Sequence, residues 1–129
     1  MTTAIICIAL LGALLFVLGW NVSRLRGSKK TVEQFPTAPD DPLFVAVRAH
    51  GNATEYVPTL AVLILLVGSR DPAVWMLVVA VVAVVSRYLH AVGVLAAGDM
   101  AKENVLRLVG AVGTVLSGVA LSVAAVLVI

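Results

Sequence analysis

Four long apolar stretches, separated by short polar segments, dominate the pattern of the chain. The first runs from Thr3 to about Val22 without a charged residue, and the others cover Pro42 to Gly68, Ala73 to about Ala97, and a final stretch from near Lys102 to Ile129. A transmembrane helix needs about 20 mainly apolar residues, and every stretch reaches that length. The pattern therefore predicts an all-α membrane protein built as a bundle of four transmembrane helices.

Turn and capping residues separate the stretches. The polar segment Gly27–Asp41 contains Pro36 and Pro39, and the run Asp40-Asp41-Pro42 predicts a helix cap followed by a first helical turn. The run Ser69-Arg70-Asp71-Pro72 predicts a tight turn before the third helix. Since four helices fill residues 1–129, we expect a single domain without a separate soluble part.

Composition excludes several classes of protein. Of the 129 residues 61% are hydrophobic and 12% are charged, whereas a soluble domain is about 45–50% apolar and 25% charged. Nine Lys and Arg against seven Asp and Glu give a net charge of +2, without a basic run interleaved with aromatic residues, so we expect no nucleic-acid partner. The single cysteine, Cys7, lies in an apolar stretch and predicts neither an internal disulfide nor a metal site.

Loop charges predict the orientation in the membrane. No Lys or Arg precedes the first stretch, which favours a retained span over a signal peptide. The first loop carries four basic residues and the third carries Lys102 with Arg107 nearby, whereas the second has Arg70 alone. By the positive-inside rule, the first and third loops face the cytoplasm and both termini lie on the far side. In a bacterium this would be an integral multi-pass protein of the inner membrane.

Polar residues within the stretches gather at one depth of the bilayer. Because successive helices alternate in direction, the end of the first and third helices and the start of the second and fourth meet on the cytoplasmic side. The residues concerned are Arg24, then Arg48, Asn52 and Glu55, then Arg87 and His90, and finally Arg107.

Helical spacing places some of these side chains on shared faces. At about 100° per residue, Arg48, Asn52 and Glu55 lie within about 60° of one another, and Arg87 shares a face with His90. A charge at the membrane centre costs about 2.5–3.5 kcal/mol on insertion scales, so such residues point inward, pair, and mark function.

Two structural interpretations stay open beside a functional one. Arg24 could be an interfacial anchor, and Glu55 could form ion pairs with Arg48 or Arg87 that hold the bundle together. However, three arginines within the helices, Arg48, Arg87 and Arg107, face a single carboxylate. The surplus of positive charge favours an anionic ligand.

The segment RAHGNATEY, residues 48–56, resembles the second helix of the MAPEG family, the membrane-associated proteins in eicosanoid and glutathione metabolism. The matching positions are Arg48, Ala49, His50, Asn52, Glu55 and Tyr56. Further segments are similar to the other helices of the family: Ser23–Arg26, the run Arg87-Tyr88-Leu89-His90 with Gly93, and Arg107–Gly110. The resemblance therefore extends over nearly the whole chain.

This resemblance implies a homotrimer that binds glutathione, or another low-molecular-weight thiol, between adjacent subunits. Arg48, Asn52, Glu55 and the neighbouring Tyr56 would hold the thiol tripeptide, and Arg24, Arg87 and His90 would line the same pocket. Arg107 would be the catalytic residue, set against the sulfur. The charges agree, since glutathione has two carboxylates and one ammonium group, and Arg suits bidentate binding of carboxylates.

The implied activity is that of a membrane-embedded glutathione transferase or peroxidase acting on lipophilic electrophiles that arrive through the bilayer. The alternative is a non-catalytic protein of the same fold that binds a lipid or a protein partner, since a fold does not imply catalysis. The sequence has Val94 where the well-studied synthases of the family have a tyrosine, and Lys102 competes with Arg107 for the position at the thiol.

We predict that the purified chain is a trimer. Polar residues meet at one depth of the subunit, and the small residues Gly110, Gly113 and Gly118 of the fourth helix should allow close packing against neighbours. Native mass spectrometry in mild detergent should give three times the subunit mass, and a monomer mass would contradict the prediction.

Overall fold

In the computed structural model, which describes residues 1–30 and 38–128, the chain forms four long helices and no strands over those residues. The helices are α1 (Thr2–Lys29), α2 (Pro42–Gly68), α3 (Val74–Ala97) and α4 (Val105–Leu127). Each is long and apolar enough to cross a membrane. The predicted all-α architecture with four membrane-spanning helices is confirmed.

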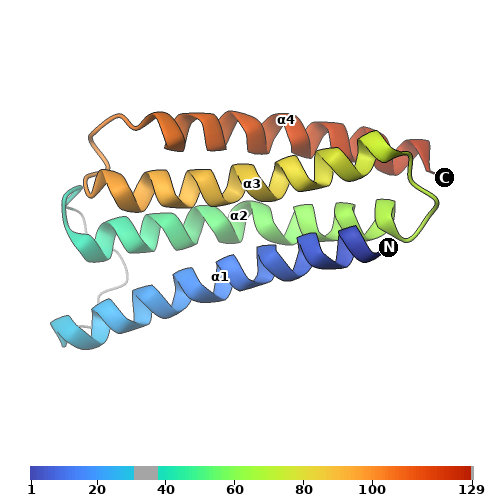
Figure 1. Ribbon diagram of the computed structural model, residues 1–129. Coiled ribbons are helices and arrows are strands. Elements are labelled where there is room, and N and C mark those ends of the chain that lie inside the picture. The colour runs from blue at the N-terminus through green and yellow to red at the C-terminus, as the bar shows by residue number, and fades with distance from the viewer. Residues whose placement is uncertain (31–37, 129) are drawn as a thin grey trace.

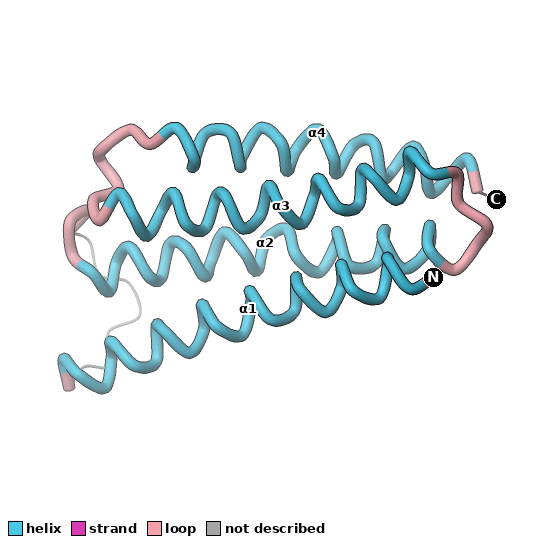
Figure 2. The backbone as a smooth tube through the Cα atoms, in the orientation of Figure 1, coloured by secondary structure: helices cyan, strands magenta, loops and turns pink. Residues whose placement is uncertain are grey.

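The helices lie side by side with alternating direction, as Figure 1 and Figure 2 show. Helices α2 and α3 each contact all the others, whereas α1 and α4 flank them without contacting each other through their described residues. The most extensive contacts join α3 to α4 and α1 to α2. Both chain ends lie at one end of the bundle, and the loop between α3 and α4 lies at the opposite end (Figure 1).

Helix α1 ends at Lys29, well beyond the predicted end near Val22. The apolar stretch defines the part that can cross the bilayer, but the polar residues after it still favour helix. Arg26 and Lys29 lie in the last turn, where cations interact favourably with the negative end of the helix dipole. Lys30 then takes a left-handed conformation, and its N–H donates to the carbonyls of Arg26 and Gly27, which closes the helix.

The start of α2 follows the predicted cap. The Asp41 carboxylate accepts hydrogen bonds from the backbone N–H groups of Leu43 at 2.6 Å and Phe44 at 3.4 Å, and Pro42 occupies the first helical position. Lys29 at the end of α1 forms an ion pair with the same carboxylate. The Lys29 ammonium, together with the backbone donors, holds the pKa of Asp41 below its ordinary value.

The other helix ends differ slightly from the predicted ones. The third helix begins at Val74, one residue after the predicted Ala73, which is its cap. The fourth begins at Val105 rather than near Lys102, because Asn104 caps it by accepting a hydrogen bond from the Arg107 N–H at 3.1 Å. The predicted end at Ile129, and residues 31–37 of the first loop with Pro36, lie outside the described residues.

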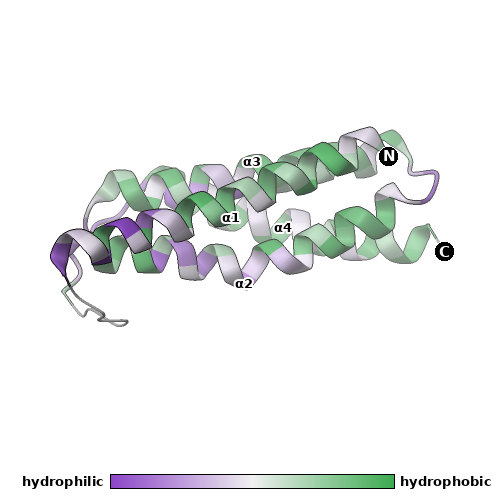
Figure 3. Ribbon diagram, turned by 90° about the horizontal axis from the view of Figure 1, so that it is seen from below, coloured by the Kyte–Doolittle hydropathy of each residue, from purple (hydrophilic) through white to green (hydrophobic). Residues whose placement is uncertain are grey.

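The outer surface of the bundle is as apolar as its interior. Leu11, Leu43 and Ile64 are among the fully buried core residues, whereas Phe16 and Val74 are each 78% exposed. Such a surface is unfavourable in water and suits the lipid tails of a bilayer. In Figure 3 the hydrophilic colour gathers over one half of the bundle, toward the end away from both termini. The chain is therefore an integral multi-pass membrane protein whose polar residues collect near one end.

Glycines allow α3 and α4 to approach unusually closely. A Cβ atom placed on Gly93 would lie 2.3 Å from the Arg107 backbone nitrogen, and one on Gly110 would lie 2.3 Å from the His90 backbone nitrogen. Similarly, a Cβ on Gly113 would lie 2.3 Å from the Ser86 hydroxyl oxygen. Gly110 and Gly113 thus pack against α3 of the same chain.

We predict that Gly110→Ala destabilises the bundle. The added methyl would overlap the backbone of α3, which cannot yield as a flexible side chain would, and overpacking of this kind costs about 1–3 kcal/mol. The midpoint of thermal unfolding in detergent should fall. The matched control is Gly12→Ala in α1, where nothing lies within 4 Å of the added Cβ and the midpoint should hold or rise slightly. Equal midpoints for the two variants would contradict the role of the glycine contact.

Candidate functional site

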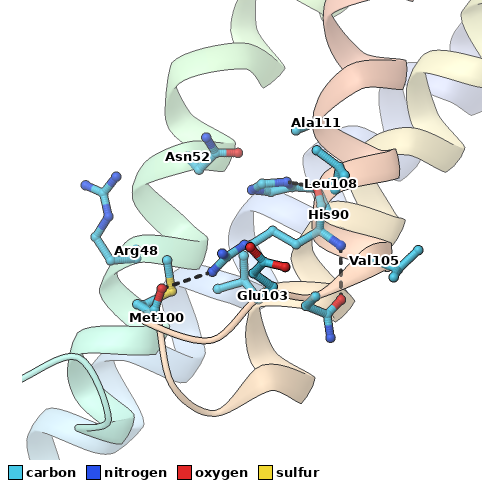
Figure 4. Close-up of a pocket in the computed structure, with 11 residues that line it drawn as sticks. Arg48, Asn52, His90, Met100, Glu103, Val105, Leu108 and Ala111 are labelled. Carbon is cyan, nitrogen blue, oxygen red and sulfur yellow. Dashed lines mark hydrogen bonds between the residues drawn. The ribbon is translucent and has the colours of Figure 1, made fainter.

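A cavity of about 530 Å³ lies at the polar end of the bundle, between α2, the end of α3 and the start of α4. Its size is within the usual range of about 300–1,000 Å³ for small-molecule sites. Charged and amide side chains line it together with apolar ones, and Figure 4 shows Asn52 of α2 across from Leu108 and Ala111 of α4. The lining residues are Arg48, Asn52, His90, Val94, Met100, Glu103, Asn104, Val105, Arg107, Leu108 and Ala111.

Arg48 and Asn52 come from the same side of α2. They are one helical turn apart, so both side chains reach the cavity, as the helical spacing predicted. In the view of Figure 4 the Arg48 guanidinium extends outward from α2, away from His90 and Glu103. This cation is exposed, whereas Asn52 is half-buried and accepts a hydrogen bond from Arg87.

His90 and Arg107 are brought together by the close packing of α3 against α4. The His90 side chain is 8% exposed, and its Nδ1 lies 3.0 Å from the Arg107 carbonyl oxygen. A carbonyl oxygen only accepts hydrogen bonds, so Nδ1 carries the proton, and in the neutral ring Nε2 is the acceptor. The ring therefore lines the cavity with a fixed orientation (Figure 4).

The loop between α3 and α4 closes one side of the cavity, and hydrogen bonds join it to the segment before α2 and to α4. The Met100 N–H donates to the Pro39 carbonyl at 2.8 Å, which ties the loop to the segment before α2. The Arg107 guanidinium donates from Nη1 to the Met100 carbonyl at 3.3 Å, drawn as a dashed line in Figure 4. Arg107 thus reaches back from α4 across the cavity toward the loop.

Arg87 does not line this cavity but lies directly behind Asn52. It is 1% exposed, donates from Nη2 to the Asn52 side-chain oxygen at 2.7 Å, and lies 3.4 Å from the Thr114 hydroxyl. Its guanidinium also sits over the ring of Tyr56, 5.2 Å from the centroid, as in a cation–π contact. A guanidinium has no acceptor, so it holds the Asn52 oxygen on its own side and leaves the amide N–H groups for the cavity.

Besides Arg87, three further predicted site residues lie outside the cavity of the single chain. Arg24 is exposed near the end of α1, where it donates to the Asn21 side chain at 3.0 Å. Glu55 is exposed on α2, and Tyr56 is 38% exposed against Arg87. Within the described residues Glu55 makes no ion pair within 4 Å, so neither predicted structural ion pair, with Arg48 or with Arg87, forms in this chain.

The structure adds lining residues that the sequence pattern did not single out. Met100, Glu103 and Asn104 belong to the loop between α3 and α4, which has no helical period to align its side chains with those of α2. The available signal was the acid and amide pair directly before the fourth apolar stretch, Glu103-Asn104. Such a pair predicts a cap, but it does not predict that the carboxylate faces a cavity.

Val94 and Lys102 have distinct surroundings. Val94, where synthases of the family have tyrosine, lines the cavity and is 1% exposed, so this wall is apolar. Lys102 is exposed and pairs with Asp99 of the same loop at 3.8 Å, and it is not among the lining residues. Arg107, in contrast, lines the cavity.

The fold and the site define an integral membrane protein of four helices with a cationic cavity at one end of the bundle. Comparison with known proteins then identifies the family. A family model, the MAPEG family, matches residues 4–127, so the chain belongs to the MAPEG family and the resemblance of the four helices is confirmed. This family of membrane proteins is associated with glutathione and eicosanoid metabolism. No curated protein and no solved structure gives a significant match.

We predict that Asn52→Leu destabilises the bundle through Arg87. The substitution removes the acceptor at 2.7 Å from a fully buried cation, and hydrogen bonds to charged groups contribute about 1.5–3 kcal/mol. The unfolding midpoint in detergent should fall for Asn52→Leu and hold for Asn52→Asp, which keeps an acceptor oxygen. The exposed Thr54→Val on the same helix serves as a surface control with little effect. Wild-type stability in Asn52→Leu would show that the bond does not hold Arg87.

Proposed function

We propose that the chain is a membrane-embedded glutathione transferase or peroxidase that acts on lipophilic electrophiles. The observation that carries this proposal is the composition of the cavity of about 530 Å³, which two arginines line together with apolar side chains. The arginines suit a small polyanionic thiol, and the wall of Val94, Val105 and Leu108 suits a molecule that partitions from the bilayer. One cavity thus offers places for both reactants.

The residues present fit a thiol tripeptide such as glutathione. Arg48 can bind one of its carboxylates, since guanidinium groups bind carboxylates bidentately. Asn52, held by Arg87, offers its amide N–H groups to a carbonyl or carboxylate oxygen. His90, with Nδ1 occupied by the Arg107 carbonyl, offers Nε2 as an acceptor. Another low-molecular-weight thiol with the same charges would fit equally.

Arg107 is the proposed activating residue. A bound thiol supplies a sulfur nucleophile, which reacts as the thiolate, and a free thiol of pKa about 8.5 is mostly protonated at neutral pH. A guanidinium within about 4–6 Å favours the charged form of such a group by about 1–3 pKa units. Arg107 lines the cavity at the start of α4, and its hydrogen bond to Met100 holds the guanidinium over the cavity.

The exposed polar residues support a trimer in which adjacent copies complete the site. Glu55 is an exposed carboxylate within a membrane-spanning helix, a costly arrangement unless another chain or water covers it. Arg24 and Tyr56 are also partly or fully exposed, and a neighbouring subunit would bring these residues to the thiol. The positive-inside rule places the cavity at the cytoplasmic end, where soluble thiols have access.

A non-catalytic protein of the same fold, binding a lipid or a protein partner, is the second candidate. The bond from the Arg107 guanidinium to the Met100 carbonyl favours it, because this bond gives Arg107 a structural task. Thiol-dependent turnover of a generic aromatic electrophile by the detergent-purified chain separates the two candidates. Thiol binding without turnover would support the second.

We predict that Arg107→Leu loses the thiolate without losing the thiol. Ultraviolet difference spectra of the wild type with glutathione at neutral pH should show thiolate absorbance. Arg107→Leu should lack this band while calorimetry still detects bound glutathione, because Arg48 and Asn52 remain. Lys102→Leu is the matched control: Lys102 is paired with Asp99 outside the cavity, so its removal should leave the band unchanged. Persistence of the band in Arg107→Leu together with its loss in Lys102→Leu would assign activation to Lys102.

A further inference from the structure

Glu103 gives the cavity a negative charge that the proposed function does not yet use. Among the described residues that line the cavity, the exposed Glu103 is the one carboxylate, beside the two arginines Arg48 and Arg107. Figure 4 shows its side chain directed into the cavity, between Met100 and His90. A carboxylate at this place would weaken the binding of a ligand with negative charge alone, since like charges repel.

The Glu103 carboxylate does not stabilise the fold through a polar contact with the described residues. It makes no hydrogen bond and no ion pair with any described residue. Asp99 of the same loop differs, because it accepts a hydrogen bond from the Ala101 N–H at 2.9 Å and pairs with Lys102. Asp99 thus stabilises the loop, whereas Glu103 lines the cavity without such a contact among the described residues.

Hydrogen bonds of neighbouring residues anchor the backbone on both sides of Glu103, whose exposed side chain lies at the edge of the cavity. On one side Met100 is bonded to the Pro39 carbonyl and receives the Arg107 guanidinium. On the other side Asn104 caps α4 through the Arg107 N–H. Glu103 lies between these anchors.

We infer that Glu103 is a specificity residue that recognises the ammonium group of the bound thiol. This inference rests on the proposed function. Two guanidinium groups and one carboxylate in a single cavity complement a ligand with separate carboxylates and one ammonium group, such as an amino-acid-derived thiol. The same carboxylate disfavours ligands with negative charge alone, including phosphate and anionic lipid headgroups. Glu55, to which the sequence pattern assigned the balancing charge, lies outside the cavity of the single chain and would reach the ligand only in the proposed trimer, whereas Glu103 lines the cavity of its own chain.

The test compares glutathione with its desamino analogue, glutaryl-cysteinyl-glycine, which keeps the thiol and both carboxylates but lacks the ammonium group. Calorimetry on the purified full-length chain should show the wild type binding glutathione about tenfold or more tightly than the analogue, as expected for a hydrogen bond between charged groups. Glu103→Gln should lose this preference by weakening glutathione alone. Unchanged binding of the analogue shows that the variant is folded.

Two further variants make the outcome specific. Asp99→Asn changes an acid to an amide in the same loop outside the cavity and should keep the wild-type preference. Glu55→Gln tests the competing carboxylate. A preference retained in Glu103→Gln, or lost in Glu55→Gln alone, would overturn the inference while leaving the proposed function in place. If neither thiol binds the wild type, the proposed function fails and the inference fails with it.

Discussion

The close approach of α3 to α4 is the contact on which the candidate site depends. Gly93 and Gly110 remove the side chains that would hold the two helices apart, and each faces the backbone of the other helix. At that separation the His90 ring reaches the carbonyl of Arg107, so the two residues proposed to meet the thiol share a hydrogen bond. Lipid tails supply no hydrophobic drive between helices, so small residues and polar bonds of this kind must hold a membrane bundle together.

Arg87 links this helix pair to α2. A buried guanidinium in a membrane is tolerated only when surrounding groups accept its hydrogen bonds, and here Asn52 and Thr114 supply oxygens from α2 and α4. Within the described residues the Nε of Arg87 has no hydrogen-bond partner, so the bonds to Asn52 and Thr114 carry the stabilisation of this cation. The same interaction that satisfies the cation orients an amide toward the cavity. Asn52 therefore stabilises the buried Arg87 and at the same time presents its amide to the cavity.

The loop between α3 and α4 completes one side of the cavity that the helices form. Its hydrogen bond to Pro39 ties the loop to the segment before α2. The hydrogen bond that it accepts from Arg107 holds this cationic side chain across the opening of the cavity. It also contributes Glu103, which changes the charge balance of the cavity from purely cationic to mixed. A loop of this kind allows members of one fold to differ in ligand preference while the helices stay alike.

The sequence by itself determined the number of helices, their approximate bounds and the depth at which the polar residues meet. These depend on the local run of apolar residues and on the alternation of direction along the chain. It also identified Arg48, Asn52, His90 and Arg107, because the alternating direction of the helices brings these residues to one end of the bundle. Only the tertiary structure decided that Arg87 lies behind the cavity, that Glu55 lies outside it and that Glu103 lines it. Those positions depend on how each helix is rotated about its axis and on the path of a loop, which arise from packing between distant segments rather than from any local pattern.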